Sequence, residues 1–216
     1  MAEIYRIAID GPSGAGKSTI AKEVAKKLNI DYIDTGAMYR AVGYKMSLEG
    51  VAVEDEDAIK KMLDNTDIDF VNGDILLDGV VVNEEIRTPE MSMMASACSA
   101  VPAVREKLVE IQRAMGRRKS VIMDGRDIGT NVLKDAEYKI YLTASAEERA
   151  DRRFKELQEK GETQTWESVL EDIKQRDYND MNRKLNPLCK ADDAIEIDST
   201  GMSIEEVVAA VLALIK

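Results

Sequence analysis

The chain has 216 residues, 44% of them hydrophobic, which is enough for one well-buried α/β domain with excursions and too short for two domains of usual size. Its formal net charge of −11 at pH 7 argues against long nucleic acids or an anionic membrane as partners, because either would require a basic face. The chain contains no histidine, which excludes a Ser-His-Asp triad and histidine-ligated zinc. Carboxylates, Lys, Arg and a bound metal remain as catalytic material.

The two cysteines and the first residues of the chain bear on the cellular compartment in which the protein is expected. Cys98 and Cys189 follow no metal-ligand spacing, and the chain opens Met-Ala-Glu without an apolar targeting segment. No run reaches the eighteen or so apolar residues of a membrane span. We therefore expect a reduced, cytoplasmic protein that binds no membrane and no nucleic-acid polymer, and we expect a monomer.

A strand, a glycine-rich loop and a helix are predicted at the start. The apolar run Ile4–Ile9 suits a buried parallel strand, and apolar residues recur every fourth position of a helix that ends near Asn29. Between them lies a segment that matches the phosphate-binding pattern G-x-x-x-x-G-K-[ST], Gly11-Pro12-Ser13-Gly14-Ala15-Gly16-Lys17-Ser18. The alternative is an ordinary glycine-rich turn, which the order of strand, loop and helix disfavours.

This loop predicts a site for ATP as phosphoryl donor. Its glycines let the backbone curl around phosphate, Lys17 supplies a charge for the β and γ phosphates, and Ser18 offers a hydroxyl to Mg²⁺. We expect the following residues to bind the nucleotide: Gly11, Pro12, Ser13, Gly14, Ala15, Gly16, Lys17, Ser18 and Thr19.

The next strand and helix carry polar residues where they meet. Asp31–Asp34 is a strand candidate, and a helix runs from Thr35 towards Leu48. Thr35 is either the N-cap of this helix or a binding residue. Arg40 is either a solvated helix residue or a binding residue. The phosphate loop upstream favours a binding role for both. The acidic cluster at 54–57 is interpreted as the solvated start of a helix rather than a metal site.

The sequence pattern changes to short strands and tight turns between residues 67 and 86. Three short apolar runs are separated by Asn72-Gly73 and Asp78-Gly79, which are strong hairpin signals. Such short connections cannot link parallel strands, so the segment predicts a small antiparallel meander inserted in a β/α chain. Helices are expected after Arg87 and after Pro102, and we interpret the basic cluster at the end of the second one as structural.

A second buried strand, Ser120–Asp124, runs into a charged turn. Ligands gather at the carboxyl ends of the strands in open α/β sheets, so Asp124, Arg126 and Asp127 are expected to face the phosphate loop. Asp124 is the candidate to hold Mg²⁺, through water, together with Ser18. The alternative is a turn with solvated charges, which is disfavoured because burying these charges without a purpose is costly.

The last part of the chain predicts a lid and a closing strand. A strand at Tyr138–Thr143 precedes a helix at Ala146–Glu159, a break at 160–163, and a helix that begins near Trp166 and continues past Arg183. On the second helix, residues at spacings of four and three share one face, where they either close over the phosphates or form a surface ion-pair ladder: Arg176, Asp180 and Arg183. A strand at Ala194–Asp198 and an amphipathic helix follow.

The predicted fold is α/β, a P-loop three-layer fold with a central parallel five-stranded sheet, an inserted antiparallel β subdomain and a helical lid. A single domain is expected, with its core at 1–62, 91–148 and 184–216, the insert at about 63–90 and the lid at about 149–183. A phosphate loop, Mg²⁺ ligands and many arginines without histidine fit phosphoryl transfer. An alcohol acceptor usually calls for a carboxylate base, whereas a nucleoside monophosphate is largely ionised at pH 7 and needs arginine clamps, for which the candidates are Arg40, Arg126, Arg176 and Arg183.

Five segments together resemble the bacterial cytidylate kinase family, and the resemblance covers nearly the whole chain, including the meander. The segments are the loop at 11–18, Ile33–Arg40, Glu85–Thr88, Asp124–Asp127 and Arg176–Arg183. The resemblance implies phosphorylation of CMP and dCMP by ATP in pyrimidine metabolism, with the meander as the insert that binds the monophosphate.

The resemblance also implies roles for individual residues. Cytosine contacts carry over to Ser96, Arg105 and Asp127, with help from Arg126, while Arg40 holds the acceptor phosphate. The residues carried over to acceptor binding are Thr35, Tyr39, Arg40, Ser96, Arg105, Arg126, Asp127, Arg176, Asp180 and Arg183, and those assigned to catalysis are Lys17, Asp124, Arg126, Arg176 and Arg183. Thr35 departs from the serine expected in many relatives, and its extra methyl group is expected to crowd the sugar. Asp127 can accept from the exocyclic amine of cytosine, which uracil lacks.

Two alternatives remain. A P-loop kinase for a small alcohol would leave the meander unexplained. A nucleotide-dependent switch protein would usually carry an N-K-x-D segment after a late strand, and the sequence contains none.

Overall fold

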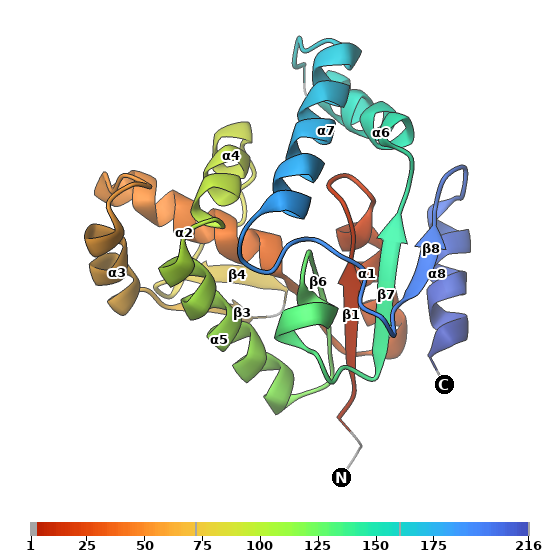
Figure 1. Ribbon diagram of the computed structural model, residues 1–216. Helices are drawn as coiled ribbons and strands as arrows, with labels where there is room; N and C mark the ends of the chain where they lie inside the picture. The colour runs from red at the N-terminus through yellow and green to blue at the C-terminus, as the bar shows by residue number, and fades with distance from the viewer. Residues whose placement is uncertain (1–3, 72, 160, 216) are drawn as a thin grey trace.

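The computed structural model describes residues 4–71, 73–159 and 161–215. Within these residues a parallel five-stranded sheet has the strand order β2-β6-β1-β7-β8, which confirms the predicted central sheet (Figure 1). Its strands are β1 (Arg6–Asp10), β2 (Asp31–Asp34), β6 (Val121–Gly125), β7 (Tyr138–Thr143) and β8 (Ile195–Asp198). The first strand begins two residues later than predicted.

The central strands are buried on both faces because helices cover both. In β1, Ile7 and Ile9 point into an apolar cluster shared with α1 (Lys17–Leu28) and α8 (Ile204–Leu214), whereas Ala8 points into the cluster on the other side. That second cluster includes residues of α2 (Thr35–Glu49), α3 (Glu56–Asp64) and α5 (Pro102–Arg118). Because alternate residues of β1 point to opposite faces of the sheet, the core consists of two clusters, one between the sheet and each layer of helices.

Helix caps place the starts of the helices. Asp55 caps α3 by accepting from the Ala58 N–H, so the acidic cluster is a helix start, as predicted. Thr88 caps α4 (Pro89–Cys98) through the Met91 N–H. Thr35 is not the N-cap of α2, which was the less favoured of its two predicted roles. Asp34 caps α2 by accepting from the Ala37 N–H at 2.8 Å, because β2 ends directly at the helix and leaves the cap position to its last residue.

The meander forms a separate antiparallel sheet of three strands in the described part of the chain, β3 (Ile68–Val71), β4 (Asp74–Leu77) and β5 (Val80–Val81). Asp78 and Gly79 both have positive φ, 51° and 79°, as a tight hairpin turn between β4 and β5 requires. Asn72 of the other predicted turn lies outside the described residues. Lys45 of α2 donates to Asp78 at 2.6 Å and anchors the meander to the core.

The predicted helix, break and helix near the end of the chain are α6 (Ala146–Glu159) and α7 (Trp166–Asn182). They pack on each other through a small apolar cluster that includes Leu157 and Val169, and they rise above the carboxyl ends of β1 and β7 (Figure 1). The second helix ends at Asn182, so the prediction that it continues past Arg183 is wrong; Arg183 has extended backbone, φ −64° and ψ 144°.

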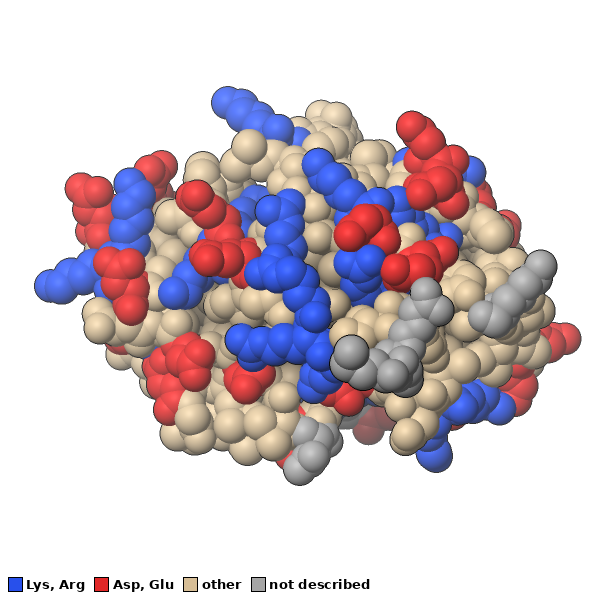
Figure 2. All heavy atoms as spheres, turned by 90° about the horizontal axis from the view of Figure 1, so that it is seen from below, with Lys and Arg blue, Asp and Glu red and all other residues tan. Residues whose placement is uncertain are grey.

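Two surface properties bear on partners. On the face shown in Figure 2, basic and acidic side chains are interspersed rather than gathered by sign. None of the helices in the described chain combines the length and apolar character that a membrane span requires.

Candidate active site

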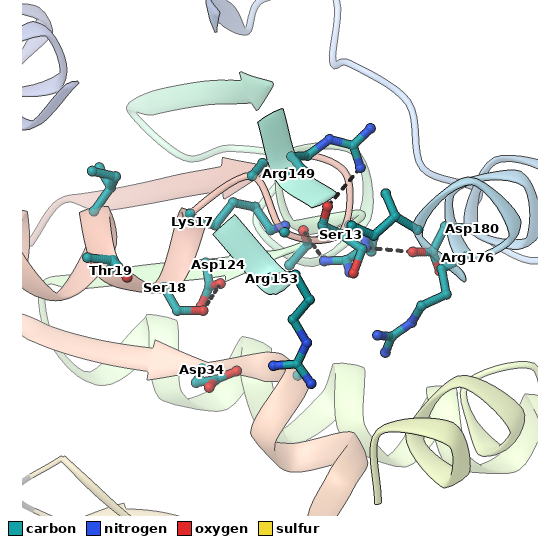
Figure 3. Close-up of a pocket in the computed structure, with 18 of the residues that line it drawn as sticks. Ser13, Lys17, Ser18, Thr19, Asp34, Asp124, Arg149, Arg153, Arg176 and Asp180 are labelled. Atoms are coloured by element: carbon teal, nitrogen blue, oxygen red, sulfur yellow. Dashed lines mark hydrogen bonds and ion pairs between the residues drawn. The ribbon is translucent and has the colours of Figure 1, made fainter. Parts of the chain in front are cut away.

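A cavity of about 830 Å³ opens at the carboxyl ends of the parallel strands. It is lined by the phosphate loop, the start of α2, one side of α4, the turn after β6, the helices α6 and α7, and the start of α8 (Figure 3). This volume lies towards the upper end of the range for small-molecule sites.

The phosphate loop owes its shape to its glycines. Gly11 has φ 154°, and a Cβ atom there would collide with the Leu142 carbonyl group of β7. Lys17 is buried and donates to the Pro12 carbonyl oxygen at 2.7 Å. Burial, and then the nearby Arg126 guanidinium, lower the pKa of Lys17 below its usual value. The negative charge of a bound phosphate group would counter both effects, because it stabilises the charged form of the Lys17 amine.

Ser18 and Asp124 meet at the end of the loop. The Ser18 hydroxyl donates to one Asp124 oxygen at 2.9 Å, and the Tyr32 hydroxyl donates to the other at 2.9 Å. Burial, and then the charge of Asp34, raise the pKa of Asp124, so a nearby cation would stabilise the carboxylate.

These oxygen donors fit Mg²⁺, which is usually bound through one or two protein oxygens, waters and substrate phosphates. Among the described residues there is no cluster of three or more Asp, Glu, Cys or His side chains that could form a complete metal site by itself. The donor set therefore fits an ion that phosphates and water help to hold.

On the opposite side of the cavity, Asp127 joins two arginines from distant elements. One Asp127 oxygen accepts from Arg105 of α5 at 2.5 Å, and the other accepts from Arg183 at 2.9 Å. The Asn131 amide also donates to Asp127, at 3.0 Å, and the Arg105 guanidinium lies 5.9 Å from the centre of the Tyr39 ring. The structure thus brings together four residues that the family resemblance assigned to the acceptor, Tyr39, Arg105, Asp127 and Arg183.

The turn that carries Asp127 is held by a carboxylate at the end of β1. Asp10 accepts from the Ile128 N–H at 2.8 Å and from the Gly129 N–H at 2.7 Å, at the start of a π-helical turn, η1 (Ile128–Val132). Burial raises the pKa of Asp10 to about 6. Asp10 was not among the predicted site residues, although it directly precedes the phosphate loop.

Arg40 has capacity for a further partner. One of its terminal nitrogens forms an ion pair with Asp34 at 3.0 Å, but its buried Nε has no hydrogen-bond partner among the described residues. A buried donor without a partner costs about 1–3 kcal/mol, so this nitrogen favours an acceptor such as a phosphate oxygen. Arg40 lines the cavity.

Arg176 and Asp180 of α7, and Arg183 directly after it, line the cavity, and Asp180 and Arg183 also form an ion pair at 4.0 Å. Arg126 donates to Asp180 at 2.7 Å, and Arg176 donates to the Ser92 carbonyl oxygen of α4 at 3.5 Å, across the cavity. The Arg183 side chain is only 11% exposed. These contacts join α7 to both the turn after β6 and α4.

Some predicted residues take other positions. Thr35 lines the cavity, but its hydroxyl donates to the Asp124 carbonyl oxygen at 2.7 Å and is engaged within the fold. Gly11, Pro12 and Arg105 lie behind the lining of the cavity, whereas Ser13 to Thr19, Ser96 and Asp127 line it.

Further lining residues were missed from the sequence: Asp34, Ser92, Arg149, Arg152, Arg153, Ser199, Met202, Ser203 and Val207. The usable signal for several of them is that they follow the carboxyl end of β7 or β8, at the same edge of the sheet as the phosphate loop.

Comparison with solved structures shows the fold. A shikimate kinase from Bacteroides thetaiotaomicron has the same fold, with a TM-score of 0.50 at 14% identity over 98% of both chains. An uncharacterised protein from Eubacterium ventriosum gives a TM-score of 0.54 at 15% identity, over 99% of this chain and 98% of that one. The phosphate loop at the carboxyl ends of a parallel sheet belongs to this shared α/β fold.

Sequence comparison then gives the family. A family model described as cytidylate kinase matches residues 7–216. A cytidylate kinase of Clostridioides difficile (strain 630) is 56% identical over 97% of both chains, and one of Caldicellulosiruptor saccharolyticus is 58% identical over 96% of this chain and 94% of its own. The chain belongs to the cytidylate kinase family.

Proposed function

We propose that the protein transfers the terminal phosphoryl group of ATP to CMP and dCMP, forming ADP and the corresponding diphosphate. The observation that carries this proposal is the placement of Asp127 between Arg105 and Arg183, across the cavity from the phosphate loop. Family membership supports the same substrates, because the curated relatives are named cytidylate kinases.

The acceptor is better matched by a phosphate than by an alcohol. An alcohol usually requires a free carboxylate as general base, whereas a monophosphate is already ionised. Each described carboxylate that lines the cavity is engaged by a cation or a hydroxyl group, namely Asp34, Asp124, Asp127, Glu156 and Asp180. This pairing disfavours the alternative of a kinase for a small alcohol.

In the proposed reaction an oxygen of the acceptor phosphate attacks the γ phosphorus of ATP. A new phosphorus–oxygen bond forms, and the bond to the oxygen that bridges the β and γ phosphates breaks, leaving ADP. Lys17 and the loop N–H groups orient the donor, while Arg126, Arg176 and Arg183 stabilise charge on the transferring group. When bound, Mg²⁺ supplies further charge neutralisation, and Ser18 and Asp124 are the residues that would hold it.

Asp127 supports selection of cytosine over uracil. Its two oxygens accept three hydrogen bonds from protein donors, which leaves one lone pair on the oxygen bonded to Arg183. The exocyclic amine of cytosine can donate there, whereas the corresponding carbonyl of uracil would face a carboxylate. The proposed acceptor residues also include Thr35, Tyr39, Arg40, Ser96 and Asp180.

The test is an ADP-release assay with Mg-ATP across CMP, dCMP, UMP, AMP and small alcohols. We expect ADP formation with CMP and dCMP, and much less with the other acceptors. Absence of ADP formation with CMP, together with clear activity with another acceptor, would overturn the proposal.

We also propose that the enzyme acts as a monomer in the cytoplasm. The free cysteines support a reducing compartment, and light scattering of the purified protein tests the oligomeric state.

A further inference from the structure

An ion pair from the two lid helices holds the backbone of one residue in the phosphate loop. Arg149 of α6 and Asp177 of α7 lie 2.7 Å apart, and we refer to this pair as the Arg149–Asp177 bridge. Arg149 donates to the Ser13 carbonyl oxygen at 2.8 Å, as Figure 3 shows, and Asp177 accepts from the Ser13 N–H at 3.1 Å. Both polar groups of the Ser13 backbone are thus held by residues more than 130 positions away in the sequence.

The bridge is buried and closely packed. The side chains of Arg149 and Asp177 are 6% and 13% exposed. A Cβ atom on Gly14, whose φ is 74°, would come within 3.3 Å of the Arg149 Cβ, which is closer than an ordinary contact, so the loop packs tightly against α6. A charge pair buried this deeply brings a desolvation penalty, and such pairs are therefore weak evidence for a role in stability alone.

The helix that carries Asp177 also carries residues of the acceptor side. Asp180, one helical turn further on, binds Arg126 at 2.7 Å, and Arg176 reaches Ser92 of α4 at 3.5 Å. Successive residues of a helix point about 100° apart, so fixing the direction of Asp177 also fixes the direction of Arg176. Through α7, the position of the phosphate loop is therefore tied to the direction of Arg176 towards the cavity.

We propose that Asp177 is a positioning residue: by holding α7 against Ser13, it aligns Arg176 with the phosphoryl group that the loop presents. The inference rests on the function proposed above. Asp177 itself is bonded to Ser13 and Arg149 and is absent from the lining of the cavity, so it acts through Arg176.

The test compares steady-state kinetics of Asp177→Asn and Asp177→Ala with the unaltered protein. Asparagine can still accept from the Ser13 N–H but loses the ion pair, so it preserves the fold best. We expect kcat to fall by about 10-fold in Asp177→Asn and about 100-fold in Asp177→Ala, with KM values for ATP and CMP changed by less than about 3-fold, since misalignment acts on the transition state. Glu171→Ala removes an exposed carboxylate from the same helix and is expected to leave kcat unchanged.

The decisive measurement repeats Asp177→Asn in an Arg176→Ala background. If Asp177 acts through Arg176, Asp177→Asn lowers kcat by less than about 2-fold in the Arg176→Ala background, because the side chain that Asp177 aligns is already gone. Effects that multiply, or a fall in kcat no larger than that of Glu171→Ala, would overturn the inference. An unaltered protein that is inactive with CMP would instead overturn the proposed function, so the two failures are distinguishable.

Discussion

The two sides of the cavity that we propose for the phosphoryl donor and for the acceptor, called here the donor side and the acceptor side, are built in different ways. The donor side is one continuous segment, Gly11 to Ser18, whose shape comes from backbone conformation and whose cation, Lys17, belongs to the same segment. The acceptor side is assembled from side chains of α5, the turn after β6 and the segment after α7, joined through Asp127. A backbone site of this kind suits a phosphate chain of any nucleotide, whereas an assembled side-chain site can select one base. Substitutions on the two sides should therefore differ in how their effects depend on the acceptor.

The largest effect is expected on the donor side. Lys17→Ala removes the charge nearest the transferring phosphates and should lower kcat by about 1000-fold or more, by the same factor for CMP, dCMP and UMP. The measurement is steady-state kinetics with each acceptor. Lys26→Ala, at an exposed position of the same helix, is the control and should change nothing. A loss confined to CMP would contradict the division between the two sides.

On the acceptor side, the largest effect is expected for Arg183→Ala. It removes a charge-assisted clamp and one of the two ion pairs of Asp127, and should lower kcat by about 100-fold while the thermal unfolding midpoint stays close to that of the unaltered protein. Arg118→Ala, at an exposed position at the end of α5, is the matched control. Unchanged kinetics in Arg183→Ala would remove the catalytic role that we propose for this arginine.

A smaller effect, on selectivity rather than on rate, is expected for Asp127→Asn. The amide no longer penalises the uracil carbonyl, so the ratio of kcat/KM for CMP to that for UMP should fall by about 10-fold. Competition between the two acceptors in one assay measures this ratio directly. A variant as selective as the unaltered protein would remove the base-reading role from Asp127.

The smallest effect on turnover is expected for Asp10→Asn, whose signature is the pH dependence of stability. Burial raises the pKa of Asp10 to about 6 in the folded state, above its unfolded value of 3.8. Asp10 therefore contributes stability that is fully present below pH 3.8 and is lost as the pH rises through about 6. The free energy of unfolding of the unaltered protein should therefore fall relative to that of Asp10→Asn from pH 4 to pH 7, by up to about 3 kcal/mol. Urea unfolding across this range checks the sign, and parallel stability curves would contradict it.

The difference between the two sides also explains what could be predicted from the sequence. The phosphate loop and its flanking strand and helix follow from contiguous residues, so the pattern alone indicated the donor side. Asp127 lies 22 residues from Arg105 and 56 from Arg183, and only the resemblance to a family connected them.

Other features required the structure because their partners are set by tertiary packing. Nothing near Thr35 in the sequence shows that its hydroxyl binds the Asp124 backbone, and nothing near Asp177 shows that it binds Ser13. The end of α7 before Arg183 was equally hidden, because no glycine or proline occurs at that point. The spacing of hydrophobic residues predicted the helices and strands well. Contacts between a side chain and the backbone of a distant residue leave no signal in the local sequence.

The two cysteines provide a practical means of observing α6 and α7, the helices that we expect to form a lid. Cys98 is buried, and burial raises the pKa of its thiol to about 12, so it is unreactive at neutral pH. Cys189 is exposed and lies between α7 and β8, in the segment that connects α7 to the sheet. A maleimide dye should therefore attach to the folded protein at one position without any engineered cysteine. Its fluorescence would report on that connecting segment as each nucleotide is added.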